Sequence, residues 1–481
     1  MRFTVIGHSC LYVETSAGTI LVDPWLFGSC YWRSWWHYPP TPEPRAEWLA
    51  PDYVYLTHHH FDHFHFPSMR RIDRNARVLV PKFGVDVLAG EVRGLGFDEV
   101  NELPHAQVLQ LGPDVRVASY QYGTDDTVLV VQDGADVLVD VNDSKIRGRA
   151  LEQIRAEFGT PTFVFKSYSF AQAYPTCYTA DDPADLGLLT RDSYVDDWIG
   201  VVTALQPRYG VPFGSMVAFL HPESRRVNPH LVAPAEVVAA FAARAPEATT
   251  VAVQMDPGDS WSSDTGFELA GVDWYVDRER RLDEIARAVQ PRIEAQDAAE
   301  AGIALDYDRF AAYFEGFLHA FPPGVIGRLA LRRPVVFEVP SSPLPYWVVD
   351  FRRRAVYRLS EPPPDTASIV RVNEAMLADA IDKKLVHVVH GSMRIAVHLR
   401  PGGAGDDITF WALLVPWELG YLPFHRAVAP RMVEVGWRRR REWLEWADAL
   451  RDGNGSGSLF ERLSGRFTTA PATTAPRAPA P

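Results

Sequence analysis

Three features are scarce in this chain of 481 residues: cysteine, net positive charge and long apolar runs. The three cysteines form no Cys-x-x-Cys pair, which excludes a zinc ribbon and a disulfide framework, and an odd count favours a reducing, cytoplasmic compartment. The formal net charge is -13 and the pI is near 5.6, which argues against a nucleic-acid partner because phosphate neutralisation needs clustered Lys and Arg. The apolar stretch from Phe410 to Phe424 is broken by Pro416 and Glu418, so we expect no transmembrane segment.

The composition is otherwise that of a globular protein, 47% hydrophobic and 12% aromatic, and the length predicts two or three domains. Short β-runs up to about residue 138, followed by helical patterns, predict an α/β fold for the first part of the chain. We divide the chain into an N-terminal α/β domain (1–265), a helical connector (266–330) with helices at 278–292 and 307–321, a small α+β domain (331–465), and a disordered tail of Ala, Pro and Thr (466–481).

One motif dominates the N-terminal part. The spacing His-x-His-x-Asp-His places His58, His60, Asp62 and His63 directly after an apolar, β-rich run at 53–56. Side chains alternate along an extended chain, so His58 and His60 share a face and can bind one ion together. Where the backbone turns into a helix, Asp62 and His63 can hold a second ion or complete the first. The alternative is a solvated histidine-rich loop, against which the flanking strand and helix argue.

A second candidate region lies further upstream. The strand predicted at 19–22 ends at Asp23, which can orient a ligand histidine or cap a turn before Pro24. An aromatic-rich loop follows, in which Arg33 can hold a phosphate or carboxylate while Trp35 and Trp36 stack on a substrate. The alternative for both tryptophans is that they fill the joint between domains.

These residues resemble the metallo-β-lactamase family, whose αββα sandwich presents His-x-His-x-Asp-His at one edge. The resemblance implies that His58 and His60 bind one metal, that Asp62 and His63 bind the other, and that Asp62 is also the candidate catalytic carboxylate. A later strand, turn and strand ends at Asn142-Asp143. By the same resemblance Asp143 is the candidate bridging carboxylate, and Asp140 is the weaker choice.

The family's third metal-binding histidine is missing from this chain, since the stretch from 119 to 126 contains none. Either the site has fewer ligands, or Asp125 or Asp126 replaces the imidazole with a carboxylate, as in metallo-β-lactamase-fold oxygenases. An oxygen-rich site favours iron, one or two ions, over zinc. The alternative for this pair is a polar turn between strands.

A further resemblance extends over 124–143 and 206–223, to the catalytic half of the CMP-N-acetylneuraminate hydroxylase family. It implies non-haem iron, and His221 becomes a candidate last ligand, although a histidine after a strand is also common at a surface. That family receives electrons through a Rieske cluster, which needs Cys-x-His and Cys-x-x-His pairs. Cys10, Cys30 and Cys177 have no such histidine, so an oxygenase here needs a separate electron donor.

Three functions follow. We favour an oxygenase with one or two iron ions that hydroxylates a small polar metabolite with external electrons. A zinc or dinuclear hydrolase that cleaves an ester, amide or phosphodiester with metal-bound hydroxide is the second hypothesis. The third is a metal-stabilised binding or scaffold protein. In it the C-terminal domain, whose element order resembles sterol-carrier-like domains, carries an apolar ligand; packing against the catalytic domain is the alternative role of that domain.

Overall fold

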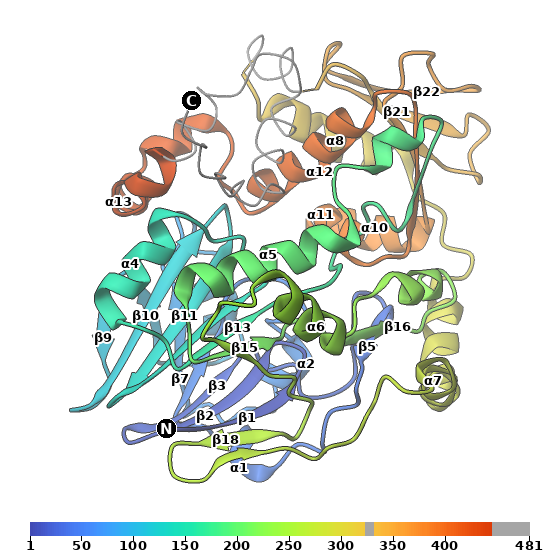
Figure 1. Cartoon of the computed structure of the whole chain (residues 1–481). Helices are drawn as coiled ribbons and strands as arrows, with labels where there is room; N and C mark the ends of the chain where they lie inside the picture. Colours follow the sequence, from blue (N-terminus) through green and yellow to red (C-terminus); the bar gives the residue numbers. More distant parts are fainter. Residues whose placement is uncertain (323–330, 445–481) are drawn as a thin grey trace, which may run out of the picture.

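A computed structural model describes residues 1–322 and 331–444 of the chain. Within them, an N-terminal part built of two large sheets lies beside a smaller C-terminal part of helices and one sheet (Figure 1). The predicted tail, 466–481, lies outside the described residues, as do 445–465 of the predicted C-terminal domain and 323–330 of the predicted connector.

The first sheet has eight strands, and its centre mixes antiparallel and parallel neighbours. In spatial order they are β19 (Gly266–Glu268), β18 (Ser260–Ser262), β1 (Arg2–Gly7), β2 (Cys10–Thr15), β3 (Gly18–Val22), β6 (Tyr53–Tyr55), β7 (Arg77–Pro81) and β8 (Val100–Leu103). The strands from β3 to β8 run parallel to one another. Their carboxyl ends therefore meet at one edge, where Asp23 follows β3 and the histidine motif follows β6.

The second sheet has seven strands. They are β17 (Val251–Ala252), β15 (Tyr209–Pro212), β13 (Phe163–Lys166), β12 (Asp136–Asn142), β11 (Asp126–Asp133), β10 (Val115–Tyr122) and β9 (Val108–Gln110). β12 is antiparallel to β11 but parallel to β13, so its carboxyl end lies on the same side as those of β13 and β15. Asp143 is the first residue after it.

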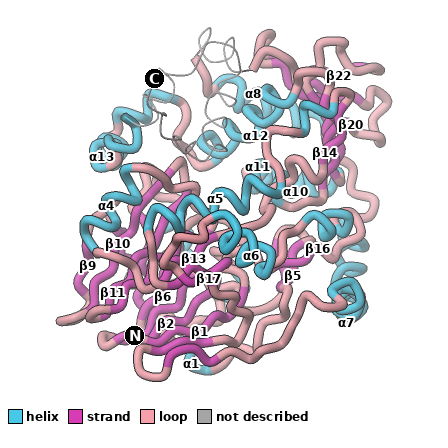
Figure 2. Tube along the Cα trace, in the orientation of Figure 1, coloured by secondary structure: helices cyan, strands magenta, loops and turns pink. Residues whose placement is uncertain are grey.

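The two sheets pack face to face, and helices cover both outer faces (Figure 2). Alternate residues such as Val5, Leu129 and Phe163 fill the space between the sheets, as the two-residue period of a strand requires. The outer helices are α1 (Ala46–Leu49), α2 (Phe66–Met69) and α3 (Leu88–Gly94) on the first sheet, and α4 (Arg149–Phe158), α5 (Arg191–Leu205) and α6 (Pro234–Arg244) on the second. This is the predicted αββα sandwich.

The C-terminal part is built on a sheet of six strands. They are β14 (Tyr178–Ala180), β24 (Ile395–Leu399), β23 (Ser368–Val372), β20 (Val335–Glu338), β21 (Tyr346–Asp350) and β22 (Ala355–Leu359). Its helices are α8 (Tyr307–His319), α10 (Glu374–Lys383), α11 (Val386–Gly391), α12 (Ala404–Glu418) and α13 (Pro430–Arg438). β14 comes from the N-terminal part of the sequence, which thus contributes a strand to the C-terminal sheet that the sequence patterns do not reveal.

A third element group joins the halves. The small sheet β16 (Val217–Phe219), β5 (Trp35–His37) and β4 (Ser29–Cys30) packs on α7 (Arg278–Glu300), and three 3-10 turns lie at Pro183–Leu186, Arg225–His230 and Phe424–Val428. Arg394, whose side chain is fully buried, binds Glu300 through two nitrogens and Glu223 through a third. Among the described helices, none has the length and apolarity needed to cross a membrane.

Candidate metal centre

The histidine motif forms the loop between β6 and α2, at the edge where the parallel strands end. His58 and His63 are almost completely buried, as is Asp62, while the His60 side chain is 31% exposed. A solvated loop would leave these side chains open to water. Burial of these three polar side chains therefore identifies the loop as part of an organised site.

His58, His60 and Asp143 form the first of two possible ligand groups, because each offers an atom within 4.8 Å of the others. The Nε2 atom of His58 lies 2.7 Å from Nδ1 of His60 and 3.7 Å from Oδ2 of Asp143. The predicted pairing of the two histidines is thus present in the geometry. Asp143 reaches them from the second sheet, at the end of β12.

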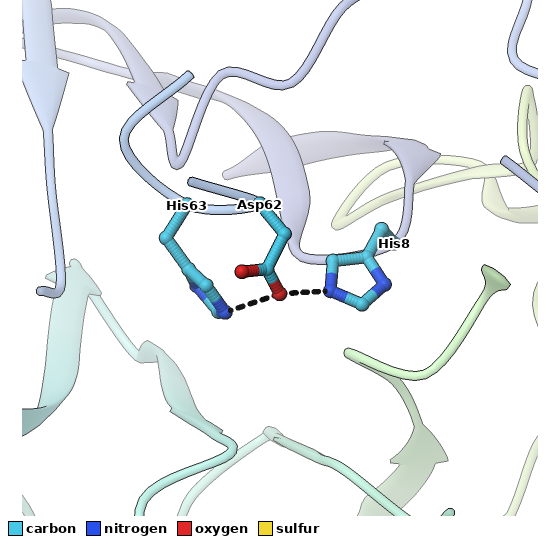
Figure 3. A group of neighbouring side chains, drawn as sticks. All are labelled: His8, Asp62 and His63. Atoms are coloured by element: carbon cyan, nitrogen blue, oxygen red, sulfur yellow. Dashed lines mark hydrogen bonds and ion pairs between the residues drawn. The ribbon is translucent and has the colours of Figure 1, made fainter. Parts of the chain in front are cut away.

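His8, Asp62 and His63 form the second group (Figure 3). The Asp62 carboxylate lies between the two rings, with Oδ2 2.9 Å from His8 Nε2 and 3.2 Å from His63 Nε2. Sequence reasoning did not include His8. The available signal was its position directly after β1, in the same way that the motif follows β6.

Asp143 lies between the two groups. Its Oδ2 atom is 3.7 Å from His58 Nε2 and 3.7 Å from His63 Nε2. This is the position expected of a carboxylate that bridges two ions. Four imidazoles and two carboxylates are a donor set that suits zinc, iron or manganese, so the residues present fit a metal centre.

Asp23 supports the centre from beneath. It is fully buried and accepts hydrogen bonds from the Thr57 amide (2.8 Å), the Thr57 hydroxyl (2.6 Å) and Asn142 Nδ2 (2.8 Å). Its Oδ2 atom also lies 2.8 Å from His63 Nδ1. Because a carboxylate only accepts, the proton of His63 stays on Nδ1 and the lone pair of Nε2 faces the centre. The structure therefore gives Asp23 the orienting role rather than the turn-capping one.

The electrostatics prepare the ligands for a cation. Burial and the neighbouring His63 lower the pKa of His58, and burial with His58 lowers the pKa of His60 to about 4, so both imidazoles are neutral at pH 7. Burial opposes the charge of Asp62, but His63 outweighs it and holds the pKa of that carboxyl well below its usual range. Burial likewise opposes the charge of His63, yet Asp62 and Asp143 raise its pKa well above 6.5. Neutral imidazoles and ionised carboxylates are the forms that bind metals, so His63 has to release a proton when an ion binds.

Asp125 and Asp126 line a cavity above the metal-binding residues but belong to neither ligand group. Asp125 Oδ2 lies 3.9 Å from His60 Nε2, so this carboxylate faces the motif. Burial, with Asp143 and Asp125, raises the pKa of Asp126 well above its usual range. Of the two, Asp125 has the geometry of an additional ligand.

His221 is not brought to the centre, contrary to the sequence expectation. Its strand, β16, belongs to the small sheet, and its Nε2 atom lies 2.9 Å from Asp297 Oδ1 on α7. Asp140 also lies outside both groups: it is fully buried in β12, and burial with the nearby Asp23 raises the pKa of its carboxyl. The sequence shows that an apolar strand precedes His221, but it does not show which sheet that strand joins.

The aromatic loop divides between the two roles considered for it. Trp35 lines the cavity, and its Nε1 donates to the carbonyl of Gly391 at 2.9 Å. Trp36 packs on α7, and its Nε1 donates to the Arg33 carbonyl at 2.8 Å. Arg33 itself donates to the Ser29 hydroxyl at 3.1 Å and does not line the cavity. The substrate role expected of Arg33 and Trp36 is therefore not supported by their positions.

A cavity of about 340 Å³ opens above the metal-binding residues. This volume is within the range of small-molecule sites. Its lining comes from both halves of the chain and includes Tyr31, Trp35, His60, Asp62, Asp125, Asp126, Asp143, Lys145, Ser167, Ser169, Gln172, Tyr194, His387, Val388, His390, Ile408, Trp411, Ala412 and Val415. The metal-binding residues thus lie at the floor of a partly enclosed cavity.

Comparison with known proteins agrees with this architecture. Residues 2–156 match a family model described as the β-lactamase superfamily domain. The N-terminal half has the metallo-β-lactamase fold. A protein of Mycobacterium tuberculosis named as a Rieske 2Fe-2S iron-sulfur protein is 32% identical over 245 residues, which are 47% of this chain and 46% of that protein. Cytidine monophosphate-N-acetylneuraminic acid hydroxylase of Mus musculus is 22% identical over 244 residues, 47% of this chain and 41% of that protein. The matched segment spans less than half the length of these relatives.

Two solved structures with this metallo-β-lactamase fold are similar to the chain at low identity. CmlA, a diiron β-hydroxylase from Streptomyces venezuelae, has 21% identity and a TM-score of 0.40 over 54% of this chain and 53% of its own. The metallo-hydrolase Igni18 from Ignicoccus hospitalis has 17% identity and a TM-score of 0.38 over 54% of this chain and 96% of its own.

Proposed function

We propose that the chain is a non-haem iron oxygenase that binds two iron ions and hydroxylates a small polar metabolite with electrons from a separate donor. The observation that supports this most directly is the shared position of Asp143 between two ligand groups, with Asp125 facing His60 beside them. Each group combines two imidazoles with one carboxylate, a ligand set that is typical of non-haem iron sites.

The two ions would be held by His58, His60 and Asp143 on one side and by His8, Asp62 and His63 on the other. Iron in such a centre supplies the activation of dioxygen. The chain's own residues hold the site in place. Asp23 fixes the proton of His63 on Nδ1, and the hydroxyl of Tyr31 donates to Asp62 Oδ1.

The relatives support the oxidative side of the proposal through their names, a hydroxylase and a Rieske iron-sulfur protein. The electrons for this reaction would come from a separate donor. Cys10, Cys30 and Cys177 are buried and unpaired, and none has the spacing of a Rieske ligand. An external iron-sulfur or flavin protein is the class of donor that we expect.

The test combines metal content with oxygen reactivity. The full chain is purified without added metal, analysed for metals, reduced anaerobically, and then exposed to oxygen while the optical spectrum is recorded. We expect about two irons per chain and an oxygen-dependent spectral change. A His60→Ala variant should lose iron and the spectral change together. Zinc alone, with no response to oxygen, would contradict the proposal.

One observation favours a second candidate, a metallohydrolase. Asp125 is 3.9 Å from His60 Nε2 and outside the ligand groups, so the six ligands that lie closest together are four imidazoles and two carboxylates. Such a set also suits zinc, which lowers the pKa of bound water for attack on an ester, amide or phosphodiester. Zinc in the purified protein and ester or phosphodiester cleavage that disappears in His60→Ala would establish this function.

A further inference from the structure

The cavity has two chemically different walls. Its floor carries the carboxylates and His60 of the metallo-β-lactamase half, whereas its opposite wall is formed by α11 and α12 of the C-terminal half. The side chains that these two helices contribute are largely apolar, namely Val388, Ile408, Trp411, Ala412 and Val415. The C-terminal half therefore closes the site and gives it an apolar surface.

Lys145 is the one lysine or arginine among the described residues that line the cavity. Its Nζ atom lies 3.5 Å from Oδ2 of Asp197. That carboxylate also binds Lys166 at 3.0 Å and Arg147 at 2.8 Å, so three cations share its single negative charge. The floor carboxylates Asp143 and Asp126 also act on Lys145, and a metal ion bound to the floor would offset their charge, which leaves Lys145 suited to an anionic group.

His387, on the C-terminal wall, has one ring nitrogen without a partner in the described structure. Its Nδ1 atom is bound by Glu418, which also accepts the backbone amides of Val386 (2.7 Å) and His387 (2.8 Å). Its Nε2 atom is buried and has no hydrogen-bond partner, and its ring centroid is 6.2 Å from that of His60. Buried polar atoms are normally hydrogen-bonded, so an orphan at a cavity wall indicates a partner that the chain does not supply.

From these observations we infer that the site takes a small amphipathic anion, with a carboxylate, phosphate or sulfonate beside Lys145 and an apolar body against α11 and α12. The inference deepens the proposed function and rests on it for the metal-loaded centre, which offsets the negative charge of the cavity floor. The C-terminal half is then a substrate-binding element rather than a passive support. A polar hydrogen on the ligand satisfies Nε2 of His387.

The test uses 1-anilinonaphthalene-8-sulfonate, an aromatic sulfonate whose fluorescence increases in an apolar site. The full chain is loaded with zinc and titrated with this probe, and its metal content is measured in parallel. We expect saturable binding of one probe per chain. Lys145→Gln should raise the Kd about tenfold, and Ala412→Phe, which adds bulk at an exposed position of the cavity wall, should raise it at least as much.

Matched controls separate the cavity from the surface. Lys383→Gln removes an exposed lysine from α10, and Trp437→Ala removes a tryptophan that is 69% exposed on α13; both should leave the Kd within twofold of the wild-type value. If Lys145→Gln and Ala412→Phe retain the wild-type Kd at full metal content, or if Trp437→Ala alone abolishes binding, the inference is wrong. Binding as predicted by a protein without iron or oxygen chemistry would overturn only the proposed oxygenase, whereas oxygen chemistry without cavity binding would overturn only this inference.

Discussion

Replacing Asp23 with asparagine should weaken metal binding in one ligand group more than in the other. The side chain is fully buried and receives hydrogen bonds from two atoms of Thr57 and from Asn142, and it contacts Nδ1 of His63. Asparagine has the same shape but carries an NH₂ group where one carboxylate oxygen stood. Oδ2 accepts from the Thr57 hydroxyl, from Asn142 and from His63, while Oδ1 accepts from the Thr57 amide, so an NH₂ group in either place faces at least one donor. The neutral amide also holds the proton of His63 on Nδ1 less strongly than a carboxylate does.

The magnitude follows from the role of His63. Loss of the group that orients a ligand histidine lowers metal affinity about 10–100-fold, or about 1.4–2.7 kcal/mol. The effect should be largest in the group of His8, Asp62 and His63. In the described part of the chain His58 is linked to Asp23 only through the Thr57 hydroxyl, which lies 3.0 Å from His58 Nδ1, so the other group should stay close to its wild-type affinity.

The assay is a zinc titration of the metal-free protein against a competing chelator. Asp23→Asn should bind one zinc with wild-type affinity and a second about 10–100-fold more weakly. Asp52→Asn is the matched control, because Asp52 also accepts an amide and a hydroxyl, those of Thr19, but lies away from the centre. Equal weakening of both sites, or two unaltered sites in Asp23→Asn, would refute the orienting role.

Three further predictions follow from other parts of the structure. His8→Ala should reduce the metal content from about two ions per chain to one, and an unchanged content would exclude His8 as a ligand. Burial and nearby arginines lower the pKa of His105 to about 3, so between pH 6.5 and 3 the unfolded protein binds a proton that the folded protein does not. Between pH 7 and pH 5 the wild type should lose about 2 kcal/mol of its free energy of unfolding that His105→Asn retains. Urea unfolding measures both pH profiles, and parallel profiles would contradict this prediction. Arg394→Met leaves Glu300 buried without its partner and should lower the free energy of unfolding by about 3–5 kcal/mol, so a change below 1 kcal/mol would refute the importance of this contact.

The sequence predicted those parts of the site that are local. The motif spacing predicts that His58 lies near His60 and Asp62 near His63, and the structure brings these pairs together, because an extended segment that enters a turn fixes the directions of side chains only a few residues apart. The patterns also predict helices at 278–292 and 307–321, where the structure has Arg278–Glu300 and Tyr307–His319. Each of these depends on contacts within one short segment.

Contributions that cross the sheets were harder to predict. His8 reaches the centre from a strand more than fifty residues earlier, and no local pattern links it to Asp62. His221 follows an apolar strand as a ligand histidine can, but β16 pairs with β5 in the small sheet rather than joining the sandwich. The pairing of β14 with β24 likewise joins segments that are far apart in the sequence. Periodicity identifies a strand but not its neighbour.

We propose that the carboxylate of Asp143 would be shared by two iron ions. The most direct measurement is a Mössbauer spectrum of the full chain loaded with ⁵⁷Fe and oxidised by air, recorded at liquid-helium temperature with and without an applied field. Two ions bridged at Asp143 should give a coupled, diamagnetic diferric pair, and Asp143→Ala should lose that signal. Isolated paramagnetic ferric ions in the wild type, or a protein that retains no iron, would contradict the account.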